Sequence, residues 1–336
     1  QLAFLVDTWR GRSDDYTFVD YALFVVSRFR EELDNGRDVP QAIAITVATA
    51  GRTVMVSLTG GKPPAGPKFS HGAPVPPGKA RVPGVKHIIA VGSGKGGVGK
   101  STTAVNLALA FAARGLRTGI LDADLYGPSI PKLLGLEGQP AVRDDGIFSP
   151  HHAHGLKAIS IGSMLTKDQA VVWRGPMATS ALRQLLRETD WGELDLLVID
   201  LPPGTGDIHI SLFQQAEIDG VVIVSTPQDL ALIDAKKAID MLPRFGVPIL
   251  GLVENMSYFI APDTGRRYDI FGSGGAQAAA ETLRLPFLGA IPLVMSIREG
   301  SDRGVPPVVG SPEGPEAAAF AAIVETILEQ SPQLAS

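Results

Sequence analysis

The sequence predicts an α/β fold, a doubly wound and mostly parallel sheet with helices on both faces. Short apolar runs rich in β-branched residues recur at 88–91, 118–121, 194–199, 221–224 and 249–253. They are nearly continuous in apolar residues, as strands covered on both faces require. Helix-like stretches separate them, at 101–114, 177–188, 230–242 and 275–284. Strands that alternate with helices at this spacing indicate a parallel sheet.

The composition narrows the class of protein. Hydrophobic residues make up 45% and charged residues 19% of the 336 positions, which is enough apolar material for a large core. The formal net charge of −5 lacks the basic footprint of a nucleic-acid-binding protein. The absence of cysteine excludes disulfides and any metal or cluster site built on this chain's own sulfur. No apolar run reaches the ~20 residues of a transmembrane helix, so we expect a cytoplasmic protein that binds neither membrane nor nucleic acid.

A segment rich in proline and glycine divides the chain. Between residues 60 and 84, 13 of 25 positions are Gly or Pro, a density that neither helix nor sheet tolerates. We therefore predict an N-terminal segment at 1–59, a linker at 60–84 and one α/β domain at 85–332.

The strongest motif follows the first predicted strand. The run Gly94-Lys95-Gly96-Gly97-Val98-Gly99-Lys100-Ser101 fits G-x-x-x-x-G-K-[ST] and leads directly into a predicted helix. Glycines let successive backbone N–H groups turn toward phosphate oxygens, and the helix N-terminus adds partial positive charge. Lys100 is expected to contact the β- and γ-phosphates and Ser101 to bind Mg²⁺. The predicted ATP-binding segment thus comprises Gly94, Lys95, Gly96, Gly97, Val98, Gly99, Lys100, Ser101 and Thr102.

Carboxylates follow two predicted strands, at the sheet edge where doubly wound folds bind ligands. Asp122 and Asp124 end the strand at 118–121, and Asp200 ends the strand at 194–199. A carboxylate near bound Mg²⁺ holds the metal shell, and one near the γ-phosphate orients the attacking water. We predict the first role for Asp200 and the second for Asp124, with Asp122 suited to either. Solvated loop aspartates are the alternative reading.

The extra lysine, Lys95, makes the loop resemble the deviant phosphate loop of the MinD, ParA and nitrogenase-iron-protein class of ATPases. The resemblance implies that Lys95 reaches the nucleotide of a partner subunit, in a nucleotide-sandwiched homodimer. It also implies that Gly204 senses the γ-phosphate and that Asn255 reads the adenine ring, with Pro292 in the base pocket. Asn255 as an ordinary turn residue remains an alternative.

Further stretches resemble the Mrp/ApbC family of iron–sulfur cluster carrier ATPases over residues 84–310. They are 125–131, Val172-Trp173-Arg174-Gly175-Pro176-Met177, 200–207, Glu254-Asn255-Met256-Ser257-Tyr258-Phe259 and Tyr268-Asp269-Ile270-Phe271-Gly272. The resemblance implies an ATP-hydrolysing homodimer that holds a [4Fe–4S] cluster transiently. Its partners would be apo iron–sulfur proteins or an assembly scaffold.

The sequence departs from this family at the cluster motif. Where the family commonly carries C-P-x-C, this chain reads Ala261-Pro262-Asp263-Thr264. Clusters are held mainly by thiolates, and an aspartate is a poor ligand for soft metals. The resemblance therefore supports ATP and Mg²⁺ as ligands, whereas no cluster ligand is identified in this chain.

Two other features call for interpretation. Three histidines, His151, His152 and His154, form a short run that we interpret as a turn between strands rather than a metal site.

Residues 16–56 resemble a membrane segment of MMPL/RND permeases. In those transporters the segment belongs to a large bundle of membrane spans, and an isolated piece of the bundle is too short to transport. A fusion or chimeric origin is our first interpretation, and a degenerate N-terminal domain is the second.

Two alternative functions stay open from the sequence. A MinD/ParA-like positioning ATPase would need a basic membrane-binding tail or a DNA-binding face. Residues 313–336 contain no Lys or Arg, which weighs against it. A nucleotide-dependent interaction protein without significant turnover differs from an ATPase only in measured hydrolysis.

Overall fold

The computed structural model describes residues 79–335 apart from 126, 165–174 and 262. The N-terminal segment, most of the predicted linker and the stretch around Trp173 therefore lie outside the described residues. The domain boundaries stay a prediction. Residues 80–84, which the composition assigns to the linker, pack against the domain: Val82 is buried and Ala80 forms a bridge with Ala216.

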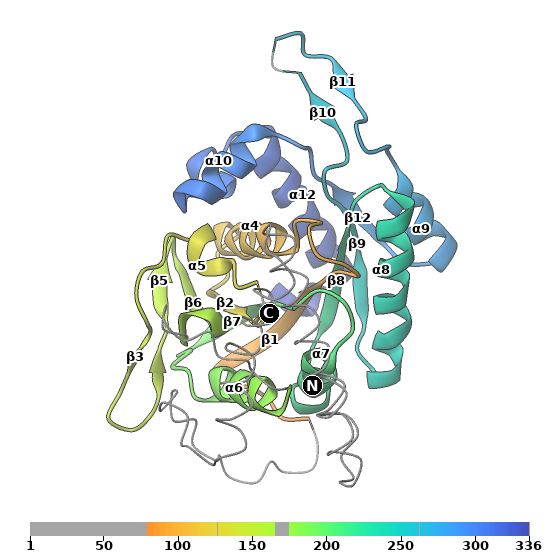
Figure 1. The fold of residues 1–336 in the computed structure, drawn as a ribbon. Coiled ribbons are helices and arrows are strands. Elements are labelled where there is room, and N and C mark those ends of the chain that lie inside the picture. Colours follow the sequence, from red (N-terminus) through yellow and green to blue (C-terminus); the bar gives the residue numbers. More distant parts are fainter. Residues whose placement is uncertain (1–78, 126, 165–174, 262, 336) are drawn as a thin grey trace, which may run out of the picture. The chain divides into compact units, whose positions relative to one another are not determined.

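An eight-stranded sheet forms the centre of the described domain (Figure 1). Its order is β12-β9-β8-β1-β7-β2-β6-β5, and every neighbouring pair is parallel except β5 and β6. The strands are β1 (Val85–Gly92), β2 (Thr118–Asp122), β5 (His151–Ala153), β6 (Leu156–Ser160), β7 (Leu194–Asp200), β8 (Gly220–Ser225), β9 (Ile249–Glu254) and β12 (Phe287–Ala290). The predicted fold class is confirmed.

Helices cover both faces of the sheet. One face carries α4 (Lys100–Ala113), α5 (Ile130–Leu133), α11 (Pro307–Gly310) and α12 (Pro315–Gln330), and the other carries α6 (Gly175–Arg187), α7 (Asp207–Gln215), α8 (Asp229–Met241) and α9 (Gly275–Leu283). Helix α10 (Met295–Arg303) packs on α5. The 3₁₀ helices are η1 (Ile161–Met164), η2 (Leu242–Phe245) and η3 (Pro332–Ala335). All four helices predicted from the sequence are present, with ends within two residues.

The apolar strands contribute side chains to two hydrophobic cores, one on each face of the sheet. In β1, Ile88 and Ala90 face the layer of α6, α7 and α8, whereas Ile89 and Val91 face the layer of α4 and α12. Side chains alternate across a strand, so a strand covered on both sides must be apolar at every position. This requirement explains the nearly continuous apolar runs, and it brings the strand ends that carry Asp122 and Asp200 to one edge.

Two small hairpins lie outside this sheet. Strands β3 (Ala141–Val142) and β4 (Phe148–Ser149) pair antiparallel, as do β10 (Phe259–Ile260) and β11 (Arg267–Tyr268). Figure 1 shows the β10–β11 hairpin extending away from the sheet beyond β9. This hairpin carries the positions at which the resembling family has its cysteines.

Candidate functional site

The predicted phosphate loop connects β1 to α4. Gly97 and Gly99 each adopt φ of 81°, a left-handed conformation that favours glycine. Gly94 must also be glycine, because a Cβ there would overlap the backbone of Asp234 and Ala235, in the middle of α8. These constraints shape a turn that ends at the N-terminus of a 14-residue helix, where backbone N–H groups are free to bind an anion.

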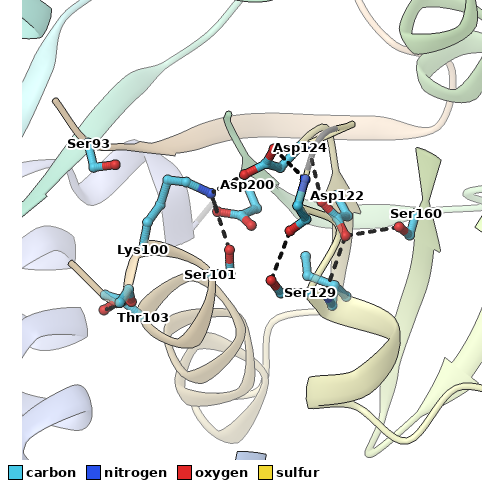
Figure 2. Close-up of polar contacts among 12 residues, drawn as sticks. Ser93, Lys100, Ser101, Thr103, Asp122, Asp124, Ser129, Ser160 and Asp200 are labelled. Atoms are coloured by element: carbon cyan, nitrogen blue, oxygen red, sulfur yellow. Dashed lines mark hydrogen bonds and ion pairs between the residues drawn. The ribbon is translucent and has the colours of Figure 1, made fainter. Parts of the chain in front are cut away.

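Lys100 lies at the first turn of α4 and is buried. Its Nζ is 2.7 Å from Oδ1 of Asp200, 3.2 Å from Oγ of Ser101 and 3.7 Å from Oδ2 of Asp124 (Figure 2). One ammonium group therefore faces two buried carboxylates. The structure brings together the residues that the sequence assigned to phosphate, Mg²⁺ and water.

Asp200, at the end of β7, is fully buried. Burial raises the pKa of its carboxyl group, while the charge and hydrogen bond of Lys100 act in the opposite direction. Its Oδ2 has no hydrogen-bond partner among the described residues. A buried, partly unsatisfied carboxylate beside the Ser101 hydroxyl is a set of hard oxygen donors, which fits a Mg²⁺ ion bound mainly by phosphate and water.

Asp122, at the end of β2, has a different environment. Its Oδ1 accepts a hydrogen bond from the Asp124 amide at 3.1 Å, and its Oδ2 accepts from Ile130 N at 3.2 Å and Ser160 Oγ at 2.9 Å. Burial, and next the charge of Asp200, raise the pKa of Asp122 to about 7. Because both oxygens are engaged, the geometry favours a role in shaping the loop between β2 and α5. Metal binding by Asp122 stays a prediction.

Asp124 occupies that loop and is 7% exposed. The amide of Gly127 donates to its Oδ1 at 3.2 Å, while Oδ2 faces Lys100. The carboxylate is thus fixed by its own loop and aimed at the centre of the site.

The segment after Asp200 runs beside the phosphate loop. The amide of Leu201 donates to Val91 O at 3.0 Å, and the amide of Gly204 donates to Ser93 O at 2.9 Å. Gly204 has φ of 87°, and the segment ends at Gly206, the N-cap of α7. The N–H of Gly204 is therefore bonded to the base of the phosphate loop.

The side chain of Lys95 is half-buried. Within the described part of the chain it makes no ion pair and no hydrogen bond, whereas its backbone carbonyl accepts from Ser93 Oγ at 2.9 Å. The contact of Lys95 with a partner subunit stays a prediction.

Asn255 lies at the end of β9, directly below the loop. Its Nδ2 donates to Val98 O at 2.8 Å, and a Cβ on Gly99 would overlap this same nitrogen. Pro292 is buried one residue after Ile291, whose amide donates to Glu254 O at 2.8 Å. The observed bond shows Asn255 supporting the phosphate loop; the adenine contacts of Asn255 and Pro292 stay predictions.

Sequence reasoning missed the function of Glu254. Its Oε1 accepts from Ser257 Oγ at 2.6 Å and from Gly274 N at 3.0 Å, and its Oε2 accepts from Ala276 N at 2.7 Å. One buried carboxylate thus joins the two ends of the β10–β11 hairpin segment and caps the start of α9. A charged residue that ends an otherwise apolar strand was the only sequence signal for it.

The cluster-motif positions, 261–264, lie in the turn that connects β10 to β11. Ala261 is 8% exposed, and Thr264 is exposed in a turn. Pro262 lies outside the described residues. Across the described ranges, no group of three or more His, Asp or Glu side chains is arranged to hold a metal ion. The histidine run is not the turn that the sequence predicted: His151 and His152 belong to strand β5 and pair with β6, and His154 follows the strand and contacts Gly304 O through Nε2 at 2.9 Å.

A comparison of the sequence with models of known protein families shows to which family the chain belongs. Residues 84–328 match the family model of the NUBPL iron-transfer P-loop NTPases. The chain belongs to this family. A shorter match, to the MMPL family, covers residues 17–58, which lie outside the described residues.

Relatives within this family are similar over most of their length. A protein of Deinococcus radiodurans is 53% identical over 251 residues, covering 74% of this chain and 71% of the relative. One of Escherichia coli K12 is 54% identical over 248 residues, covering 74% and 67%. Both relatives are named iron–sulfur cluster carrier protein.

Solved structures agree on the fold. A nucleotide-binding protein of Archaeoglobus fulgidus, in complex with ADP, is 41% identical with a TM-score of 0.62, covering 71% of this chain and 93% of that one. The cell division ATPase MinD of Pyrococcus furiosus is 25% identical with a TM-score of 0.56, covering 73% and 99%. Among the described helices, none is long and apolar enough to cross a membrane.

Proposed function

We propose that this chain binds ATP with Mg²⁺, hydrolyses it as a homodimer and uses the cycle to carry iron–sulfur clusters. The observation that carries the proposal is the buried group at the phosphate loop, in which Lys100 is held 2.7 Å from Asp200 and 3.7 Å from Asp124. A cation between two carboxylates at a helix N-terminus is poised to exchange one partner for a phosphate. The family relationship and the ADP complex of the Archaeoglobus relative support it.

The residues of the loop divide the work of binding the nucleotide. Backbone N–H groups from Gly94 to Gly99 and the first turn of α4, including Ser101 and Thr102, surround the phosphates. Lys100 turns from Asp200 toward the β- and γ-phosphates. Asn255 keeps the loop in place through Val98 and, with Pro292, lines the base pocket.

Hydrolysis depends on the carboxylates. When bound, Mg²⁺ neutralises charge on the phosphates, and Ser101 and Asp200 provide oxygen ligands for it. Asp124 accepts a hydrogen bond from the attacking water and orients it. Gly204 changes its hydrogen-bond partner from Ser93 to the γ-phosphate, so its segment reports whether the nucleotide is ATP or ADP.

Lys95 supports the proposed homodimer. Its ammonium group has no partner in the described part of its own chain, and in the partner subunit it would find the negative charge that develops on the phosphates during hydrolysis. We propose that ATP holds two subunits face to face and that dimerisation and hydrolysis are linked.

The cargo cannot be bound by thiolates of this chain, since the sequence contains no cysteine. We propose that the chain supplies the nucleotide-driven part of cluster transfer, while thiolates come from an apo-protein, a scaffold or a small thiol. A [4Fe–4S] cluster is thus a transferred substrate that is ligated from outside the chain.

Nucleotide turnover and its lysine dependence test the first part. The wild type should hydrolyse ATP slowly in the presence of Mg²⁺, and Lys100→Ala should abolish it. Lys79→Ala, an exposed position whose Nζ contacts Phe245 O, is the matched control and should be unchanged. Turnover that survives in Lys100→Ala would show that another site hydrolyses ATP.

Sedimentation tests the dimer, and anaerobic reconstitution tests the cargo. Lys95→Ala should bind ATP but lose most hydrolysis and ATP-induced dimerisation. A wild type that stays monomeric with ATP would refute the nucleotide-sandwiched homodimer.

After anaerobic incubation with iron and sulfide, the protein alone should hold little cluster, and added thiol should increase the iron retained. Near-stoichiometric iron without thiol would refute external ligation.

A further inference from the structure

His209 is a buried side chain that the proposed mechanism does not use. It lies in the first turn of α7, is 3% exposed, and neither ring nitrogen forms a hydrogen bond with any described residue. Nearly all buried polar side chains in proteins have a partner, and leaving one without costs stability. An imidazole in this state therefore needs a functional explanation.

The surroundings of His209 belong to the nucleotide-sensing segment. The backbone carbonyl groups of Pro202 and Gly206 lie near the ring and raise its pKa as weak acceptors, but neither reaches the distance and angle of a full hydrogen bond. A small cavity is lined by Ser93, Gly204 and His209, and the Phe213 ring lies 6.2 Å from the imidazole. Two acceptors on either side of Gly204 thus stand next to an unused donor.

The ring is neutral at physiological pH. Burial lowers the pKa of His209 to about 4, with Lys100 adding to the effect and Asp124 and the two carbonyl groups opposing it. A neutral imidazole carries one N–H donor and one acceptor. It can therefore form one good hydrogen bond to a backbone carbonyl without taking up a proton.

We propose that His209 is a positioning residue that holds segment 202–206 in its ATP-bound position by donating a hydrogen bond to the carbonyl of Pro202 or Gly206. This inference rests on the proposed function. In the structure, the Gly204 amide is bonded to Ser93 O at 2.9 Å. A γ-phosphate competes for this amide, and moving Gly204 also moves the two carbonyl groups, since each is only two residues away. The imidazole therefore makes a full hydrogen bond in one position of the segment and only a weak contact in the other.

Two substitutions at His209 separate this role from simple packing. His209→Leu removes both nitrogens, and His209→Gln keeps a donor. The exposed His152→Gln on β5 is the control for loss of a histidine. Melting temperature without nucleotide, affinity for ADP and for a non-hydrolysable ATP analogue, and steady-state hydrolysis are measured for all four proteins.

His209→Leu should melt about 3 °C higher than the wild type without nucleotide, because an unpaired buried group is gone. It should bind ADP within twofold of the wild type, yet lose about tenfold in affinity for the ATP analogue and in kcat, the loss of roughly one hydrogen bond. His209→Gln should recover most of both, and His152→Gln should change nothing.

Equal loss of ADP and analogue affinity, or unchanged analogue affinity and kcat in His209→Leu, would overturn the proposal. Because the ADP-to-analogue ratio needs no turnover, it tests His209 even if the wild type does not hydrolyse ATP, an outcome that refutes the proposed function alone. If His209→Leu does not fold, ¹⁵N-histidine spectra of the wild type replace it, with the signal identified by its absence in His209→Gln. The ring N–H should become hydrogen-bonded with the analogue and not with ADP, and an identical signal in both would overturn the proposal.

Discussion

Removing the charge of Lys100 should destabilise the nucleotide-free protein, besides ending turnover. Lys100→Met keeps most of the side-chain length but leaves Asp200 buried without its cation, and Asp124 loses a neighbour at 3.7 Å. Deleting one partner of a buried ion pair costs about 3–5 kcal/mol. We expect a loss of about 3 kcal/mol in the free energy of unfolding at pH 8, because the native state can reduce the cost by protonating Asp200.

The loss should depend on pH with a definite sign. Burial raises the pKa of Asp200 even with Lys100 present, and removing the lysine takes away the largest opposing effect. The folded variant then keeps a proton that the unfolded chain releases above a pKa of about 3.9. Where the folded state binds more protons, stability falls as pH rises, so the deficit should be smaller at pH 5.5 than at pH 8.

Urea unfolding followed by circular dichroism, in EDTA and without nucleotide, measures this deficit at both pH values. The double variant Lys100→Met with Asp200→Asn removes both charges and should recover most of the stability, whereas Lys79→Met should lose little. A deficit below about 1 kcal/mol at pH 8, or one that does not change with pH, would refute the reasoning that Lys100 compensates a buried carboxylate.

Three further outcomes are expected. The double variant Ala261→Cys with Thr264→Cys supplies four thiolates per homodimer, so reconstitution should yield bound iron and visible absorbance that the wild type lacks. No gain would show that the β10–β11 turns of the two subunits do not meet. On folding, the pKa of His209 falls from 6.5 to about 4, so the unfolded chain takes up a proton at a higher pH than the folded chain does. Between pH 6.5 and 4, the free energy of unfolding of the wild type should therefore fall by about 3 kcal/mol relative to that of His209→Leu, as measured by urea unfolding. Equal pH dependence of the two proteins would contradict this. Glu254→Gln places an NH₂ group against backbone donors and should speed hydrogen exchange in β10 and β11, whereas unchanged exchange would mean that other contacts hold the hairpin.

The sequence predicted what depends on local pattern. Five of the eight sheet strands, four helices and the phosphate loop follow from periodicity and from glycines whose backbone angles the structure shows, such as Gly97 and Gly99, whereas β5, β6 and β12 were not predicted. Placing Asp122 and Asp200 at one sheet edge required only that both end parallel strands, and their direct pairing at the ends of β2 and β7 agrees with this.

The partners of individual side chains could not be predicted. Asn255 and Val98 are 157 residues apart, and their bond depends on the positions of β9 and β1 in the sheet, where only β8 separates them. Two of the three donors to Asp122 come from the segment that follows it, between β2 and the start of α5, but the third, Ser160, lies on β6 and could not be predicted. The unpaired state of His209 is equally invisible in sequence, since an amphipathic helix that begins with Asp-Ile-His has many ways to satisfy a histidine.

Consecutive residues at the end of β9 serve two distant segments. Asn255 holds the phosphate loop through Val98, and Glu254 holds both ends of the β10–β11 hairpin. Adjacent residues at the end of β9 therefore hold both the phosphate loop and the hairpin. We therefore expect a substitution that alters the hairpin at Glu254 to change nucleotide affinity as well, so effects at the two places must be separated by double-mutant cycles rather than read from single variants.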